Sequence, residues 1–304
     1  MRIGTRGSAL ALVQAELVRR AYLERFPDRE VQVVVIRTEG DRRADVPLSS
    51  IGGSGVFVKE IQARLLAGEI DCAVHSAKDL AVAEVEGLEL AAFLPRAPAH
   101  DVLIRRPTAA TGTAGDPGER FGGPPGAGFR IATGSPRRRA QLGDAWPGVE
   151  FVEIRGNVDT RLRKLEEGAA DGLVLAAAGL RRLGLQPQGE APIPISVCVP
   201  SPAQGAIVAQ ARLDDPAAAD LRWLNHLETS LAVSAERDMA AALGASCTLP
   251  LGVHVEFRGG ETRLLAALHD GRALHRLETR SAAGDPAEAV RLAMAELRDR
   301  GVRW

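Results

Sequence analysis

Cysteine is scarce in this sequence, and the patterns missing around it exclude several classes of protein. The 304 residues include three cysteines, Cys72, Cys198 and Cys247, an odd number without any CxxC spacing, which disfavours a disulfide framework and a zinc site. We therefore expect no metal and a reducing, cytoplasmic compartment. No run of about 18 apolar residues is present, and the first residues lack a secretory signal pattern, so the sequence predicts no membrane partner.

A dominant charge is also missing. Basic and acidic side chains nearly balance, at 38 and 39, and a net charge of −1 argues against holding DNA or RNA by bulk electrostatics. Lysine is as scarce as cysteine: of the 38 basic residues 35 are arginine, and only Lys59, Lys78 and Lys164 are lysine. Hydrophobic residues make up 45% of the chain, enough to bury a core. Any position that keeps a lysine is therefore of interest.

Short apolar strands alternate with amphipathic helices in the first two thirds of the chain. A strand at 2–5 leads into a helix capped by Ser8 and running to about Arg25. A strand at 31–36, a helix at 56–67 and a strand at 71–75 follow. Strands separated by helices in this way are typical of parallel βαβ units.

An internal repeat supports two such units. A pattern of apolar, glycine and aspartate positions recurs at the same spacing, first at Leu65, Gly68, Asp71, Val74, Ala77 and Leu80, and again at Leu165, Gly168, Asp171, Val174, Ala177 and Leu180. Strand–helix units in general also share some of these positions. We interpret it as two similar α/β domains that face each other across a cleft.

The remainder of the chain has a different pattern. Strands at 249–257, 262–268 and 273–279 with a helix at 286–300 predict a small antiparallel sheet of α+β type, preceded by helices at 217–227 and 229–243. The stretch 107–128 is rich in glycine and proline and is expected to be a surface loop. The predicted domains are 1–94 with 199–223 (α/β), 98–194 (α/β) and 227–304 (α+β).

Arginines gather where the predicted strands meet helices. Helix N-termini and guanidinium groups both bind oxyanions, and ligands of open α/β sheets bind at the carboxyl ends of the strands. Any one of these arginines fits an ordinary surface salt bridge better, but as a group they predict a cleft for a ligand with several carboxylates or phosphates. The group comprises Arg6, Arg137, Arg138, Arg155 and Arg161, with Ser8, Thr133 and Ser135 beside them.

Asp79 is the most informative carboxylate. It follows the predicted strand at 71–75 and stands beside Lys78, so we expect it to project into the same cleft. A carboxylate among cations could stabilise a cationic intermediate or transfer protons, although an ordinary surface pair of lysine and aspartate explains the residues about equally well.

Two loops leave their roles open at this point. Cys247 lies on a predicted loop, where a free thiol is more often unremarkable than a nucleophile or an attachment point. The glycine-rich segment before the helix at 56–67 lacks the spacing of a phosphate-binding loop, and we interpret residues 38–55 as a flap over the cleft. A nucleotide-dependent enzyme is therefore disfavoured.

Several motifs, in this order along the chain, resemble the porphobilinogen deaminase family. They are Ile3-Gly-Thr-Arg6-Gly-Ser8, Phe57-Val-Lys59-Glu60, His75-Ser76-Ala-Lys78-Asp79, Arg137-Arg138, Arg155-Gly156-Asn157-Val158, Ala178-Gly-Leu-Arg-Arg182 and Gln204-Gly205-Ala206. The similarity covers nearly the whole chain. It implies two domains resembling periplasmic binding proteins and a third domain that carries a cofactor.

The resemblance also implies an activity. The family is a transferase of tetrapyrrole and heme biosynthesis that joins four porphobilinogen molecules with loss of ammonia and releases hydroxymethylbilane. Its primer is a dipyrromethane cofactor held by a thioether to one cysteine, which Cys247 matches. Asp79 matches the catalytic acid, which would stabilise the azafulvenium cation formed when ammonia leaves.

Further positions match those that hold the acetate and propionate groups of cofactor and substrate: Arg6, Ser8, Ser76, Lys78, Thr133, Ser135, Arg137, Arg138, Arg155, Gly156, Arg161, Arg182 and Gln204. Glu39 and Ser54, both in the 38–55 segment, depart from the family pattern. We expect a monomer with porphobilinogen as its small-molecule substrate and no nucleic-acid partner. The alternative is a non-catalytic protein of the periplasmic-binding type that captures a carboxylate or other anion in the same cleft.

Overall fold

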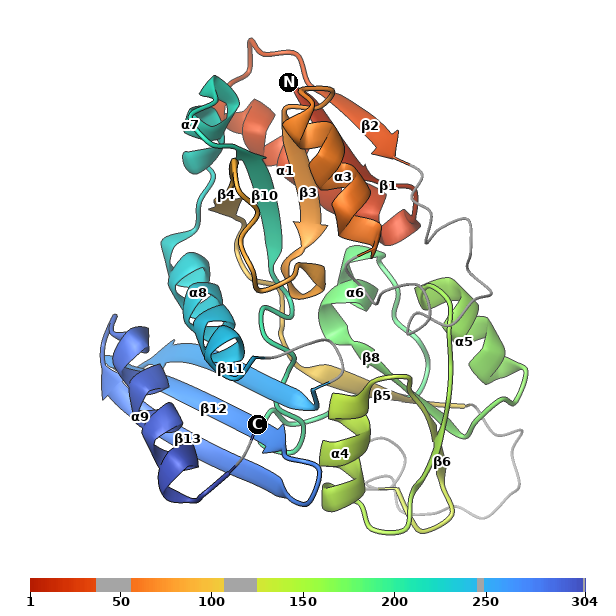
Figure 1. The fold of residues 1–304 in the computed structure, drawn as a ribbon. Coiled ribbons are helices and arrows are strands. Elements are labelled where there is room, and N and C mark those ends of the chain that lie inside the picture. Colours follow the sequence, from red (N-terminus) through yellow and green to blue (C-terminus); the bar gives the residue numbers. More distant parts are fainter. Residues whose placement is uncertain (37–55, 107–124, 245–248, 303) are drawn as a thin grey trace.

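Three β-sheets organise the chain in the computed structural model, which describes residues 1–36, 56–106, 125–244, 249–302 and 304 (Figure 1). The first sheet has the order β2 (Gln32–Ile36), β1 (Arg2–Arg6), β3 (Cys72–Ser76), β10 (Ile207–Arg212), β4 (Leu88–Phe93). The second has the order β7 (Glu150–Val152), β6 (Arg130–Ala132), β8 (Gly172–Ala176), β5 (Asp101–Arg105), β9 (Glu190–Pro192). The third consists of β11 (Leu251–Arg258), β12 (Glu261–His269) and β13 (Leu274–Ala282).

Helices cover both faces of the first two sheets and bury their apolar side chains. In the first sheet, α1 (Ala9–Arg25) and α7 (Pro216–Arg222) contribute to the core around Ile3, and α3 (Val56–Leu66) packs on Ala73. In the second sheet, α4 (Pro136–Ala145) packs on Ile131, while α5 (Val158–Glu166) and α6 (Ala177–Arg182) pack around Leu173. These are the layers of an α/β fold.

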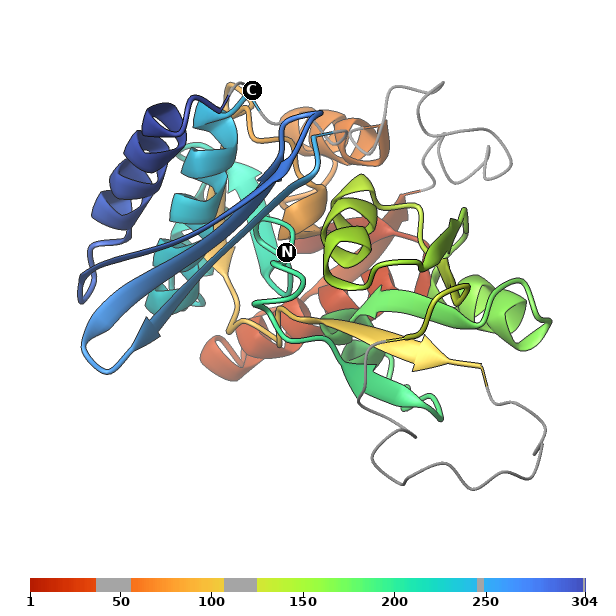
Figure 2. The same cartoon turned by 90° about the horizontal axis from the view of Figure 1, so that it is seen from below.

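The third sheet has helices on one face. There α8 (Leu227–Ala242) and α9 (Pro286–Asp299) share a core with the sheet that includes Met239, Val253 and Leu297 (Figure 2). Two α/β sheets and one antiparallel α+β sheet confirm the predicted fold class. The strands of the first sheet come from both ends of the predicted split domain, and the domain boundaries themselves stay a prediction.

Local signals determined the helix starts and stops. Ser8 is the N-cap of α1 and its Oγ accepts from the amide of Ala11 at 3.3 Å, and α1 ends at Arg25 as predicted. Gly68 follows α3 with a φ of +71°, a conformation that favours glycine. The helix expected at 217–227 was wrong at its end, because α7 stops at Arg222 and α8 begins at Leu227.

Strand directions differ in part from the prediction. β1 pairs in parallel with β2 and β3, and β6 pairs in parallel with β7 and β8. However, β10 runs antiparallel to β3 and β4, and β5 runs antiparallel to β8 and β9, so both sheets are mixed. Strand direction depends on distant pairing, which the helical spacing along the chain does not report.

Candidate functional site

The end of β3 presents Lys78 and Asp79 to solvent. β3 continues into a short 3-10 turn, η2 (Ala77–Asp79), whose start is fixed by the Ala77 amide donating to the Ala206 carbonyl oxygen at 3.0 Å. Both charged side chains are exposed. Ser76 is held beside them, because its Oγ accepts from Gln14 Nε2 at 2.7 Å. The acid and one of the few lysines therefore lie at the carboxyl end of a central strand.

The second sheet presents two helix starts at the corresponding edge. Thr133 is buried and its Oγ1 accepts from the Ser135 amide at 3.2 Å, while Ser135 Oγ caps α4 by accepting from the Arg138 amide at 3.4 Å. Gly156, with a φ of +113°, precedes the start of α5. Its carbonyl oxygen accepts from Arg161 Nε at 2.7 Å, which fixes this arginine over the first turn of α5.

Charged groups at the two edges act on one another's pKa. Burial and the charge of Arg138 lower the pKa of Arg161, whereas the charges of Glu153 and Asp79 raise it. Lys78 is open to solvent, yet protein packed around it lowers its pKa, with a raising contribution from Asp79 and a lowering one from Arg138. Lys78 and Asp79 at the end of β3 thus lie within electrostatic range of arginines on α4 and α5, and their joint role toward a ligand stays a prediction.

Arg137 and Arg138 are buried and bind a carboxylate of the protein itself. Both are 6% exposed and bind the fully buried carboxylate of Asp101, Arg137 Nη2 at 2.7 Å and Arg138 Nη2 at 2.8 Å. Arg137 Nη1 also donates to the Val199 carbonyl oxygen at 2.7 Å, and Arg138 Nη1 to that of Val174 at 2.9 Å. These donors already have protein partners, so direct contact of the two arginines with ligand carboxylates stays a prediction.

Asp101 is the buried counterion that the sequence analysis missed. Burial alone would raise its pKa, but the charges of Arg137 and Arg138 and their hydrogen bonds hold it well below the usual range. In the sequence it is an acid in front of the apolar strand Val102–Ile104, which looks like an ordinary exposed strand start. Only the pairing of β5 with β8 places it beneath α4, so no local signal identified it.

Gln204 is also buried, at 1% exposure, and does not face solvent. The side-chain Nε2 of Gln204 donates to Asp101 Oδ1 at 2.9 Å and to the Ala99 carbonyl oxygen at 2.6 Å. The main-chain carbonyl oxygen of Gln204 accepts from Arg96 Nε at 2.9 Å. Arg96 in turn makes a two-point ion pair with buried Glu236 of α8, at 2.7 and 2.9 Å. In this conformation Gln204 connects the sheets, and its expected role toward carboxylates stays a prediction.

Glu236 extends this connection to the third sheet. Its carboxylate accepts from the amides of Ala203 and Val255 at 2.6 and 2.8 Å. Burial would raise its pKa, but the charge of Arg96 and the contacts of His254 and Arg96 lower it to about 2. The sequence analysis assigned none of these residues a role.

The remaining candidates lie at element ends. Arg6 closes β1 next to the capping Ser8 and is half-buried. Arg182, on α6, donates from Nη2 to the Gly205 carbonyl oxygen at 2.6 Å, and burial lowers its pKa to about 10. Arg155 follows β7, exposed, with its Nε 3.5 Å from Glu153 Oε1.

Some predictions concern residues outside the described ranges. Cys247 falls between α8 and β11, and the proposed flap at 38–55, with Glu39 and Ser54, also lies outside the described part. Within that part, no group of three or more histidine, cysteine or acidic side chains could hold a metal ion. Cys72 and Cys198 are free thiols and buried.

No helix in the described ranges is long and apolar enough to cross a membrane.

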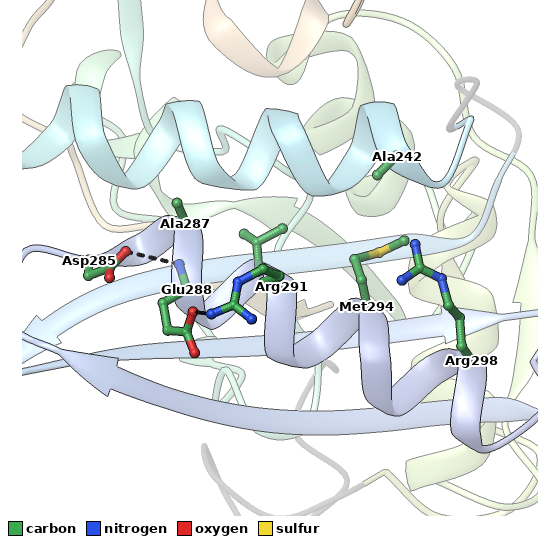
Figure 3. Close-up of a pocket in the computed structure, with 8 residues that line it drawn as sticks. Ala242, Asp285, Ala287, Glu288, Arg291, Met294 and Arg298 are labelled. Carbon is green, nitrogen blue, oxygen red and sulfur yellow. Dashed lines mark hydrogen bonds and ion pairs between the residues drawn. The ribbon is translucent and has the colours of Figure 1, made fainter.

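A groove of about 460 Å³ lies between α8 and α9, away from these residues (Figure 3). Met294 and Arg298 line it together with Arg291, which is ion-paired with Glu288. Asp285 Oδ1 accepts from the Glu288 amide at 3.0 Å and caps α9. Because the described residues lining the groove include none of the predicted site residues, it is not part of the candidate site.

Comparison with known proteins identifies close sequence relatives. Residues 1–220 match the family model described as "Porphobilinogen deaminase, dipyromethane cofactor binding domain". The chain is 44% identical over 276 residues to the porphobilinogen deaminase of Pelobacter propionicus, covering 90% of this chain and 85% of the relative. It is 40% identical over 309 residues to that of Syntrophobacter fumaroxidans, covering 100% and 96%.

The solved structures that align with this chain are less similar in sequence. The VFT2 domain of Bordetella pertussis BvgS aligns with a TM-score of 0.40 at 13% identity, covering 73% of this chain and 84% of that domain. The periplasmic aliphatic sulphonate binding protein SsuA of Escherichia coli aligns with a TM-score of 0.39 at 14% identity, covering 80% and 69%.

Proposed function

Since this chain belongs to the porphobilinogen deaminase family, we propose that it joins four porphobilinogen molecules head to tail with loss of ammonia and releases hydroxymethylbilane. The observation that supports the residue assignments is that Lys78 and Asp79, at the end of β3, lie within electrostatic range of Arg138 on α4 and Arg161 on α5. The exposed carboxylate of Asp79 lies there among several cations. That arrangement suits chemistry in which a polycarboxylate ligand becomes positively charged at one carbon.

Asp79 is the proposed catalytic residue. Loss of ammonia leaves positive charge on the substrate, and an exposed carboxylate at a strand end can stabilise that charge and transfer a proton to or from a pyrrole nitrogen. The surrounding cations are proposed to bind substrate carboxylates and so to orient the reacting carbon toward Asp79. Guanidinium groups suit this task because they bind planar carboxylates at two points.

The cations divide into two proposed roles. The first group is proposed to contact ligand carboxylates directly. It comprises the cations Arg6, Lys78, Arg155, Arg161 and Arg182 and the neighbouring residues Ser8, Ser76, Ser135 and Gly156. The second group is buried and hydrogen-bonded within the protein, so we propose that it primarily stabilises the structure beneath the site. It comprises Arg137, Arg138, Thr133 and Gln204. Either role predicts loss of function on substitution, but only the second predicts loss of stability as well.

The dipyrromethane cofactor fits this donor set. Its acetate and propionate groups need cations, and Lys78, Arg161 and Arg155 offer them at exposed or half-exposed positions. When bound, the cofactor supplies the pyrrole end to which new units are added. We propose that Cys247 attaches it, on the connection between α8 and β11.

Intact mass tests this proposal. The purified protein should be heavier than its sequence mass by one dipyrromethane, and a Cys247→Ser variant should lack the increment. A wild-type protein at its sequence mass would sink the assignment of cofactor and cysteine together. The Cys198→Ser variant, which changes a buried thiol, is the matched control and should keep the added mass.

We also propose that the protein is a monomer in the cytoplasm, with domains at 1–94 with 199–223, 98–194 and 227–304. Sedimentation of the holoenzyme at several concentrations tests the first statement. An anion-binding protein without catalysis is not favoured, because residues 1–220 match the porphobilinogen deaminase model and because that alternative leaves Cys247 and the third domain without a purpose.

A further inference from the structure

Glu153 stands between two arginines at the edge of the candidate site. It follows β7 directly, and its carboxylate lies 2.9 Å from Arg139 Nη2 through Oε2 and 3.5 Å from Arg155 Nε through Oε1. The first contact is a hydrogen bond, whereas the second is an ion pair beyond hydrogen-bond length. Arg155 belongs to the proposed ligand-binding set, and Arg139 does not.

Two loops determine where the Glu153 carboxylate lies. Arg139 is anchored because its Nε and Nη2 both donate to the Thr133 carbonyl oxygen, at 3.2 and 3.0 Å. Gly134 lets the carboxylate approach, since a Cβ there would lie 2.8 Å from Glu153 Oε1. Glu153 therefore connects the 133–135 loop to the 155–156 loop, and both loops carry proposed ligand-binding residues.

The field of Glu153 extends further into the site. Its charge is among those that act on Arg161, whose other carboxylate neighbour is Asp79. Within the described residues, Glu153 is the carboxylate that pairs with Arg155. Its side chain is 52% exposed, so an incoming carboxylate can reach the same guanidinium from solvent.

We propose that Glu153 takes the place of a ligand carboxylate at Arg155, so that a substrate carboxylate must compete with it for this guanidinium. Glu153 is thus a positioning and specificity-determining residue: it holds Arg155 in place between turnovers and weakens carboxylate binding there. This inference rests on the proposed function, in which Arg155 binds ligand carboxylates.

The test is steady-state kinetics of Glu153→Gln holoenzyme with porphobilinogen. Glutamine keeps the size and a hydrogen-bond acceptor for Arg139 but removes the charge that competes at Arg155. Because a half-exposed ion pair contributes modestly, we expect KM to fall by about two- to fivefold, with kcat unchanged or lower. The difference from wild type should shrink as salt is added, because salt screens exposed charges.

Glu150→Gln is the matched control, since Glu150 is an exposed acid on the same strand, β7. It should leave KM unchanged. Glu153→Ser, which removes the charge without adding an amide, should lower KM in the same direction. A merely structural Glu153 would give unchanged or higher KM in both Glu153 variants, and an equal fall in the Glu150 variant would show a general charge effect; either result overturns the inference.

Arg155→Leu separates this inference from the proposed function. If Arg155→Leu loses elongation while Glu153→Gln leaves KM unchanged, only the role of Glu153 fails. If Arg155→Leu elongates normally, the assignment of Arg155 itself fails, and with it the premise for Glu153.

Discussion

The first and second sheets repeat one scaffold and differ in the side chains at their strand ends. Strand order and direction agree, including an antiparallel fourth strand in each. Backbone contacts agree as well, because the amides of Asp71 and Asp171 donate to the carbonyl oxygens of Arg2 and Arg130, both at 2.9 Å. The repeat predicted from sequence is therefore confirmed at the level of individual hydrogen bonds.

The residues with proposed chemical roles lie where the two copies differ in sequence. After β3 the first copy continues with Lys78 and Asp79, whereas after β8 the second copy has Ala178 and Gly179 at the corresponding places in α6. The first copy thus provides the acid of the candidate site. The second copy provides most of the arginines of the candidate site, on helices α4, α5 and α6 and just before α5.

A second divergence lies in the interior. Asp101 of β5 pairs with Ala176, and the corresponding register position in the first copy holds Ile207 of β10, opposite Ser76. Both side chains are buried, one as an ion and one as a hydrocarbon. The same scaffold thus accommodates either side chain, provided that the ion has the two arginines of α4 as partners.

The largest expected effect concerns the divergent acid. Asp79→Asn should lower kcat by roughly 10²–10⁴-fold, because an amide can neither stabilise positive charge nor transfer the proton. Gly179→Ala, the change at the corresponding place in the second copy, should be near neutral, since the new Cβ would lie 3.7 Å from Leu10 Cδ2, an ordinary contact. Hydroxymethylbilane formation measures both, with cofactor content checked by mass. A near-normal rate for Asp79→Asn would remove Asp79 from catalysis.

The next effect concerns the interior. Asp101→Asn should destabilise the fold by about 3–5 kcal/mol, because it leaves two buried guanidinium groups without their counterion. The matched change in the first copy, Ile207→Val, should cost about 0.5–1.5 kcal/mol. Chemical unfolding at neutral pH gives both values. Equal, small losses would mean that Arg137 and Arg138 find other partners.

Several features of the fold and of the candidate site were predictable from local sequence. The helix that Ser8 caps, the stop at Gly68 and the exposed Asp79 were predicted, because capping, glycine conformation and position after a strand are local properties. The role of Cys247 came from the family resemblance and lies outside the described residues.

Non-local pairings account for what was missed. β5 and β10 were not predicted, and their antiparallel direction places Asp101 under α4 and Gln204 between the sheets. In the sequence, Arg137 and Arg138 look like free cations at a helix start. Whether they face a ligand or a buried carboxylate depends on Asp101, which lies 36 and 37 positions before them in the chain.

An effect of intermediate size is the pH dependence of stability that His75 of β3 gives to the first copy and that β8 of the second copy lacks. Burial lowers the pKa of His75 to about 4, although a hydrogen bond with Gln210 acts in the opposite direction. The corresponding residue of the second copy is Leu175. Between pH 6.5 and 4 the unfolded chain binds a proton at His75 and the folded chain does not, so stability should fall by about 3 kcal/mol as pH decreases through this range.

The His75→Leu variant places the residue of the second copy in the first. It should lose this part of the pH dependence, which unfolding at pH 7.5, 5.5 and 4.5 would measure. A Leu175→Ile variant, which has no titrating group, should keep the wild-type slope. Should His75→Leu show the wild-type slope as well, the pH dependence would have to come from other groups.

The smallest effect compares two ion pairs that the repeat places alike. Arg2 Nη2 lies 2.6 Å from Asp71 Oδ1, whereas Arg130 Nη2 lies 3.4 Å from Asp171 Oδ1. Both pairs are partly exposed, so each aspartate-to-asparagine change should cost no more than about 1 kcal/mol, with Asp71→Asn costing a few tenths more. The asparagine oxygen can still accept the backbone amide that each aspartate accepts, at 2.7 and 3.0 Å. Unfolding midpoints at low and high salt measure the difference, which salt should narrow. A larger loss for Asp171→Asn would show that the two copies differ in these ion pairs in a way that their distances do not express.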